Sequence, residues 1–166
     1  MLKWIWLALF VVVLDQVTKY IASNSLILFQ PVAVMPMFNW TLMHNTGAAF
    51  SFLADQAGWQ RWFFAAIAIV VSIVIFLWIK RLEQHEKWLA IALALILGGA
   101  VGNVIDRIWL GYVVDFIQVY YEQWYWPAFN IADSAIVIGV VMIIIESIRE
   151  YRDEKKLDKK QVNKNG

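Results

Sequence analysis

The sequence contains no cysteine, only two histidines and only three prolines. Without cysteine the chain can form no disulfide, no thiolate nucleophile and no cysteine-ligated zinc site, and it offers no thiol for attachment of a lipid. His44 and His85 are far apart and do not form the His-Glu-x-x-His pattern of zinc peptidases. A metal-dependent peptidase therefore has little support in the sequence.

Charged residues are also scarce. They make up 16% of the 166 residues, whereas an average soluble domain contains about 25%. Hydrophobic residues reach 61% and are concentrated in long blocks, which is typical of a membrane protein. The net charge is +1, and no basic face exists outside the C-terminal tail, so we expect no nucleic-acid partner.

Four segments are apolar enough to cross a membrane. A spanning helix needs about 20 residues, because about 30 Å of hydrocarbon is crossed at about 1.5 Å per residue. The first segment is interrupted by Asp15 and Lys19 and is followed by no small-x-small cleavage site, so we interpret it as a helix rather than a signal peptide. The predicted spans are residues 4–22, 62–79, 88–105 and 128–147.

Lysine and arginine are distributed asymmetrically around these spans. Residues 80–87 and 149–166 are rich in both, whereas residues 20–60 contain neither and residues 106–127 contain only Arg107. The positive-inside rule then predicts that both termini are cytoplasmic and that the other two connections face outward. We expect one transmembrane domain, residues 1–148, and a charged cytoplasmic tail, residues 149–166.

Asp15 and Lys19 lie one helical turn apart inside the first span. Charged groups are costly in a bilayer and persist mainly where they are paired or functional. One interpretation is an ion pair that tethers helices, since the acid precedes the lysine by four residues. The other is that Lys19 acts as a general base and activates Ser51 or Ser134.

The outward segments carry two further acids. Asp115 is flanked by β-branched and aromatic residues, and Asp133 follows Asn130 by three positions, which alone would suit a helix N-terminus. Together they lie at the same predicted membrane face. Amide hydrolysis without a metal or a nucleophilic side chain requires one carboxylate that takes a proton from water and one protonated carboxyl group that polarises the carbonyl. The two acids therefore suggest an aspartyl hydrolase.

Two neighbouring segments could shape such a site. Residues 38–45 are rich in aromatic and β-favouring types and predict a short strand or strand pair, which is either a structured loop or an edge that docks a peptide. Glycines in residues 98–102 permit close helix packing at the end of the third span. Asn103, Asp106 and Arg107 follow and form a polar helix end.

Five motifs occur in order along the chain. They are Asp15-Gln16-Val17-Thr18-Lys19, Asn45-Thr46-Gly47-Ala48-Ala49-Phe50, residues 99–107, Val114-Asp115-Phe116 and Phe129-Asn130-Ile131-Ala132-Asp133. With them the sequence resembles the lipoprotein signal peptidase (signal peptidase II) family over about residues 4–148.

The resemblance implies an all-α membrane protein of four transmembrane helices with a small extracytoplasmic β-cradle and a short extracytoplasmic helix. Residues 38–45 would belong to the cradle, and the helix would lie in residues 54–61 or 108–126, with the second stretch favoured. The implied activity is an aspartic endopeptidase without cofactors that cleaves diacylglyceryl prolipoproteins N-terminal to the lipidated cysteine. Membrane lipids and the inhibitor globomycin are the other implied partners, and we expect a monomer.

The resemblance also assigns site residues. Asp115 and Asp133 would be the catalytic dyad. The supporting residues would be Asp15, Lys19, Asn45, Gly47, Asn103, Asp106, Arg107 and Asn130.

Two other classes of function compete with this reading. A small four-helix transporter would also place an acid in an apolar helix, but near the midplane, whereas these polar residues gather at the outer end. A non-catalytic scaffold would leave Asp115 and Asp133 unexplained.

Overall fold

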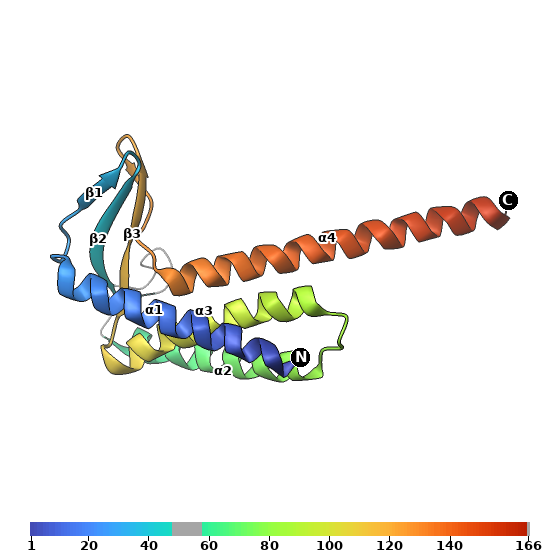
Figure 1. The fold of residues 1–166 in the computed structure, drawn as a ribbon, viewed down its shortest axis with the longest axis horizontal. Helices are drawn as coiled ribbons and strands as arrows, with labels where there is room; N and C mark the ends of the chain where they lie inside the picture. Colours follow the sequence, from blue (N-terminus) through green and yellow to red (C-terminus); the bar gives the residue numbers. More distant parts are fainter. Residues whose placement is uncertain (48–57, 166) are drawn as a thin grey trace.

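The computed structural model describes residues 1–47 and 58–165, with side chains described up to residue 156. Its helices form a bundle, and a small sheet stands at one end of that bundle (Figure 1). After a short 3-10 helix, Leu2–Trp4, the elements are α1 (Ile5–Ser25), β1 (Val32–Met35), β2 (Phe38–Asn45), α2 (Trp59–Arg81), α3 (Lys87–Trp109), β3 (Val113–Tyr121), β4 (Trp124–Tyr125) and α4 (Ile131–Asn165).

The four long helices confirm the four predicted spans. Each is long and apolar enough to cross a membrane and overlaps its predicted span, although α4 begins at Ile131, three residues later than predicted. Uninterrupted helices are possible because Pro31, Pro36 and Pro127 all lie in the connections or at the sheet. Helix α4 continues without a break past residue 148 to Asn165, so the predicted tail is a helical extension of the last span.

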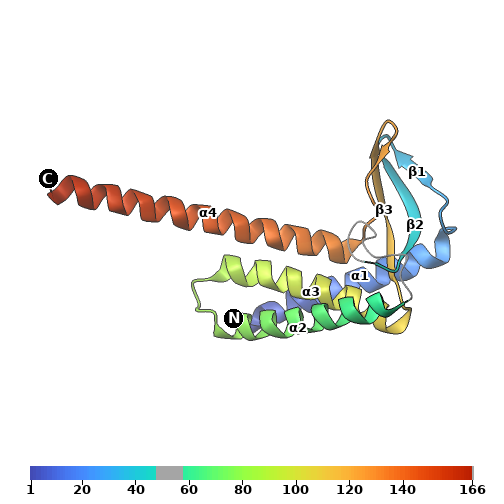
Figure 2. The same ribbon diagram turned by 180° about the vertical axis from the view of Figure 1, so that it is seen from behind.

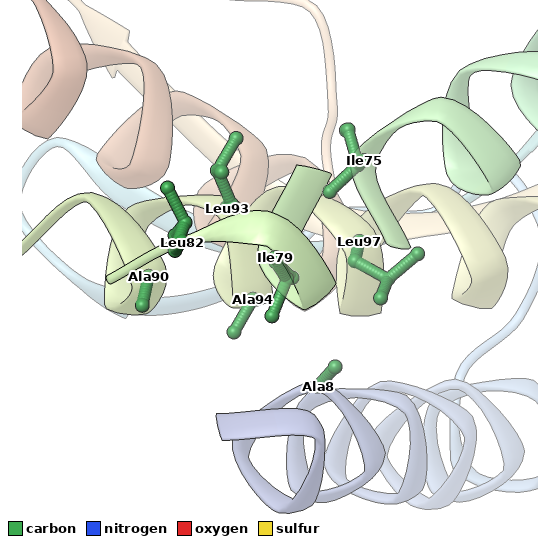
Figure 3. Packing of buried hydrophobic residues seen from close by; sticks show 8 residues of the cluster. All are labelled: Ala8, Ile75, Ile79, Leu82, Ala90, Leu93, Ala94 and Leu97. Atoms are coloured by element: carbon green, nitrogen blue, oxygen red, sulfur yellow. The ribbon is translucent and has the colours of Figure 1, made fainter. Parts of the chain in front are cut away.

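Helix α3 is the centre of the bundle. It contacts each of the other three long helices and is the most deeply buried of the four. Figure 3 shows its Leu93, Ala94 and Leu97 packed with Ile79 of α2 and Ala8 of α1. Glycine allows α4 to approach closely, since a Cβ on Gly139 would lie 2.6 Å from the carbonyl oxygen of Ala92.

The sheet has the order β1-β2-β3-β4, with all neighbours antiparallel. Strand β2 has the bounds that the sequence predicted, and Met43 of β2 pairs with Asp115 of β3. The segment before α4 pairs with β3 as well, through reciprocal backbone hydrogen bonds between Phe129 and Ile117. The sheet therefore fixes the point at which α4 begins.

The prediction of a short helix within residues 108–126 is wrong. Those residues contain the end of α3, a turn and strands β3 and β4. The run Val113–Tyr121 consists mostly of β-branched and aromatic residues, which fit a pleated surface better than a helix. Of the alternative stretch, residues 54–57 lie outside the described part, and α2 begins at Trp59.

Seen from both sides, the sheet lies at the opposite end of the bundle from the N-terminus (Figures 1 and 2). Helix α4 starts beside the sheet, and its C-terminal part projects beyond the bundle. The polar residues singled out from the sequence gather at the sheet end, where β3, the start of α4 and the end of α3 meet.

Candidate active site

Asp115 is a buried carboxyl group on β3, with only 2% of its surface exposed. Its two oxygens accept hydrogen bonds from different side chains: Oδ1 from Asn130 Nδ2 at 2.7 Å, and Oδ2 from Asn45 Nδ2 at 3.1 Å. Burial, followed by the nearby charge of Asp133, raises the pKa of Asp115 to about 7. Near neutral pH this acid can therefore hold a proton.

Asp133 lies in the first turn of α4, and its position is set by the helix cap. The side-chain oxygen of Asn130 accepts the backbone N–H of Asp133 at 2.9 Å, while Asp133 Oδ2 accepts the backbone N–H of Asn130 at 3.3 Å. This reciprocal pair is a capping box, with aspartate in place of the usual glutamate. The cap holds Asp133 partly exposed at the end of the helix.

Two asparagines connect the two acids. Asn130 donates to Asp115, as described above, and also to Asn103 Oδ1 at 3.2 Å. Asn103 in turn donates to Asp133 Oδ1 at 2.8 Å. Since the asparagines come from α3 and from the cap of α4, three elements hold the carboxyl groups in one network.

Lys19 is buried between α1 and α3, and its ammonium group has three acceptors. They are Asp15 Oδ2 at 2.8 Å, Asp106 Oδ2 at 2.9 Å and Asn103 Oδ1 at 2.9 Å. An ammonium group has three hydrogens, so all of its donors are used. Asp15 and Lys19 form the ion pair expected from their spacing. The second ion pair of Lys19, with Asp106, was not predicted from the sequence.

The two acids that bind Lys19 each also accept a hydrogen bond from a backbone N–H. In each case the donor is the residue that precedes a candidate catalytic acid. Asp15 Oδ1 accepts the N–H of Ala132, the residue before Asp133, at 2.9 Å. Asp106 Oδ2 accepts the N–H of Val114, the residue before Asp115, at 3.0 Å. One buried cluster thus fixes the backbone beside both acids.

Arg107 and Gly47 lie at the edge of the site. The guanidinium of Arg107 donates to the Gly47 carbonyl at 3.1 Å and to the Asn103 carbonyl at 3.3 Å. It also lies close enough to the carboxyl groups of Asp133, Asp115 and Asp106 to interact with them electrostatically. The backbone N–H of Gly47 donates to Asn45 Oδ1 at 3.0 Å, which orients the amide that contacts Asp115. The next motif residues, Ala48 to Phe50, lie outside the described part.

Gln16 is a contact residue that sequence reasoning did not single out. Its Nε2 lies 2.9 Å from Asp106 Oδ1, 3.2 Å from the Gly102 carbonyl and 3.3 Å from Asp15 Oδ2. It therefore links the two acids that share Lys19. The signals in the sequence were an amide side chain in the middle of an apolar span and its place in the first motif, between Asp15 and Lys19.

A mechanism in which Lys19 activates a serine would require contact between Lys19 and a serine hydroxyl, and the described residues show no such contact. The hydroxyl of Ser134 donates to the Asn130 carbonyl at 2.9 Å, while Lys19 contacts Asp15, Asp106 and Asn103. Ser51 lies outside the described residues. Across residues 1–47 and 58–156, no group of three or more His, Asp or Glu side chains is arranged to hold a metal ion.

Comparisons with known proteins agree on one family. A family profile described as "Signal peptidase (SPase) II" matches residues 7–149. The chain is 57% identical over 155 residues to the lipoprotein signal peptidase of Pseudomonas putida, and the match covers 92% of this chain and 91% of that protein. It is also 57% identical over 153 residues to that of Pseudomonas aeruginosa, covering 91% and 90%.

Two solved structures, each of a bacterial membrane enzyme, have the same fold. The first is 36% identical to this chain, with a TM-score of 0.81, and the match covers 91% of this chain and 90% of the solved one. The second is 38% identical, with a TM-score of 0.74, and the match covers 87% and 91%.

Proposed function

The chain belongs to the signal peptidase II family, and from this premise we propose that it is an aspartic endopeptidase in which Asp115 and Asp133 are the catalytic pair. The family makes it a peptidase of lipoprotein signal peptides, and its four apolar helices indicate a multi-pass protein of the bacterial inner membrane. The substrate would be a diacylglyceryl prolipoprotein, cut on the N-terminal side of the lipidated cysteine.

The observation that carries the aspartic mechanism is the pair of unlike carboxyl groups. Asp115 is buried with its pKa raised to about 7, whereas Asp133 is partly exposed and accepts hydrogen bonds from Asn103 and from the Asn130 backbone. Two neighbouring acids in such different surroundings suit a division into one proton donor and one proton acceptor.

In this mechanism Asp133 is the general base and Asp115 the general acid. Asp133 takes a proton from water as the water oxygen attacks the scissile carbonyl carbon, and the neutral Asp115 donates a hydrogen bond to the carbonyl oxygen. Collapse of the tetrahedral intermediate breaks the C–N bond, and Asp133 passes the proton that it took from water to the leaving amine of the lipidated cysteine. Asn45 and Asn130 hold Asp115 from both oxygens, so its hydroxyl proton can point only away from them.

Substrate depth would be set by lipid. The carboxyl groups lie at the sheet end of the helices, which the positive-inside rule places at the extracytoplasmic boundary of the bilayer. Burial of acyl chains is worth about 0.8 kcal/mol per CH₂, and two chains give stable attachment to the membrane. A diacyl anchor would thereby hold the scissile bond at one height and reduce the entropy lost on binding.

The test compares one purified precursor with and without its diacylglyceryl group. We expect loss of the signal peptide from the lipidated form only, and we expect globomycin to compete with it. Equal cleavage rates for the two forms would show that the site recognises only the peptide, and the assignment of a lipidated prolipoprotein as substrate would then be wrong.

A further inference from the structure

Arg61 is a basic residue at the sheet end of the bundle that the catalytic proposal does not use. It lies in the first turn of α2, and its guanidinium packs against the turn between α3 and β3. A Cβ at Gly111 would lie 2.8 Å from Arg61 Nη1, the far end of a flexible side chain, and Gly111 has a φ of +89°, which favours glycine. The guanidinium therefore lies against the backbone of this turn.

No acid neutralises this cation within the described part of the chain. Lys19 contacts Asp15 and Asp106, and Arg107 lies near Asp133 and Asp115, but none of the ion pairs there includes Arg61. Its Nε is buried and has no hydrogen-bond partner. The first turn of α2 contains no acidic residue, and a cation at a helix N-terminus is unfavourable. An external anion at the guanidinium would offset this unpaired charge.

The surroundings of Arg61 indicate the source of that anion. The guanidinium stacks on Trp62, 4.4 Å from the ring centre, and Trp62 and Trp59 are both exposed on the outside of the bundle. Exposed tryptophans at the end of an apolar helix mark the headgroup level of a bilayer. Arginine binds phosphate oxygens through two parallel N–H groups.

We propose that Arg61, backed by Trp62 and the turn at Gly111, binds the phosphate of a membrane phospholipid beside the active-site end of the bundle. The site lies at the sheet end of α2, and none of its residues takes part in the hydrogen bonds of the Asp115–Asp133 network. The inference depends on the membrane location of the chain and not on the aspartic mechanism.

The absence of cysteine allows a site-specific test. A fluorophore on Phe63→Cys, at an exposed position two residues from Arg61, would be quenched by a phospholipid carrying a nitroxide in its headgroup. In detergent-solubilised full chain, Arg61→Gln should raise the lipid concentration for half-quenching about tenfold, which corresponds to about 1.4 kcal/mol. Arg81→Gln, at the other end of the same helix, is the matched control and should leave quenching at residue 63 unchanged.

Competitors separate the sources of phosphate. Unlabelled phosphatidylglycerol should restore the fluorescence, whereas diacylglycerol with the same chains and inorganic phosphate at the same concentration should not. Arg61→Lys, which keeps the charge but loses the paired N–H groups, should fall between wild type and Arg61→Gln. Unchanged quenching in a folded Arg61→Gln protein, or equal competition by diacylglycerol or inorganic phosphate, would overturn the proposal.

Discussion

Asp115 and Asp133 differ in their surroundings although both are aspartates on neighbouring elements. Replacing either by asparagine preserves size and one of the two acceptor oxygens but removes the ability to accept or donate the required proton. We expect Asp115→Asn and Asp133→Asn each to lower kcat by at least about 10³-fold, with normal accumulation of the protein. Turnover of a lipidated precursor measures this. Near-normal turnover by either variant would rule out the pair.

The raised pKa of Asp115 predicts how activity depends on pH. A general acid must be protonated to act. On the alkaline side of the pH profile, the rate should therefore fall as pH rises through the Asp115 pKa of about 7. A profile of kcat/KM between pH 5.5 and 8.5 measures the midpoint. A rate that stays constant up to pH 8.5 would show that Asp115 does not act as the acid.

Stability should change in the same direction for the same reason. Because the folded-state pKa lies above the ordinary value of about 3.9, the folded protein holds a proton that the unfolded chain loses between these values. The stabilisation is full below about pH 4 and is lost as pH approaches 7. The contribution of residue 115 to this trend should disappear in Asp115→Asn, which thermal unfolding at several pH values can measure.

At the level of single residues, the sequence indicated which side chains gather but not how. Asp115, Asp133, Asn103 and Asn130 stood out because polar groups are rare in this chain, and the structure brings them into one network. Their roles in catalysis stay predictions. The backbone N–H groups of Ala132 and Val114 could not be foreseen, because every residue has one and only the tertiary fold selects two of them.

Among the elements, α1, α3 and α4 are joined by polar contacts inside an otherwise apolar bundle. Removing the cation from this cluster would leave Asp15 and Asp106 buried without compensation, and breaking a buried pair in this way costs about 3–5 kcal/mol. We therefore expect Lys19→Met to lower the free energy of unfolding by that amount, measured by thermal or denaturant unfolding in detergent.

Lys3→Met is the matched control, since Lys3 is exposed at the start of the same helical segment and should have an effect near zero. Combining Lys19→Met with Asp15→Asn should recover part of the loss, because one unpaired charge is then removed. If Lys19→Met were as stable as wild type, the cluster would not be the link between these helices.

Element boundaries were predictable where the pattern is local. The spans follow from apolar length, and β2 follows from its aromatic and β-favouring residues. The helix expected in residues 108–126 came from family resemblance, whereas the residues themselves, Val113–Tyr121 above all, favour a strand. Pairing of Phe129 with Ile117 joins residues that are 12 positions apart, and no local pattern reveals it.

At the scale of the whole molecule, the orientation in the membrane is the main prediction still to be tested. The turn between β3 and β4 and the connection between α2 and α3 lie at opposite ends of the bundle (Figure 1), and the exposed residues Gln123 and Gln84 belong to these two segments. In this cysteine-free chain a single Gln123→Cys should react with an impermeant thiol reagent added to spheroplasts, and Gln84→Cys should react only after lysis. Labelling of Gln84→Cys in intact spheroplasts would show that the predicted orientation in the membrane is wrong.

The pairing of Asp15 with Lys19 within one helix has a consequence for biogenesis. Helix α1 leaves the ribosome long before α3 and α4 exist, yet it must enter the bilayer with two ionisable groups. Because these groups are one turn apart in the same helix and 2.8 Å from each other in the folded chain, α1 by itself can pair the two charges as it inserts. The remaining acceptors of Asp15 and donors of Lys19 are then satisfied by Asp106, Asn103 and Ala132, which are synthesised later. The polar centre is therefore complete only after the last helix has been inserted.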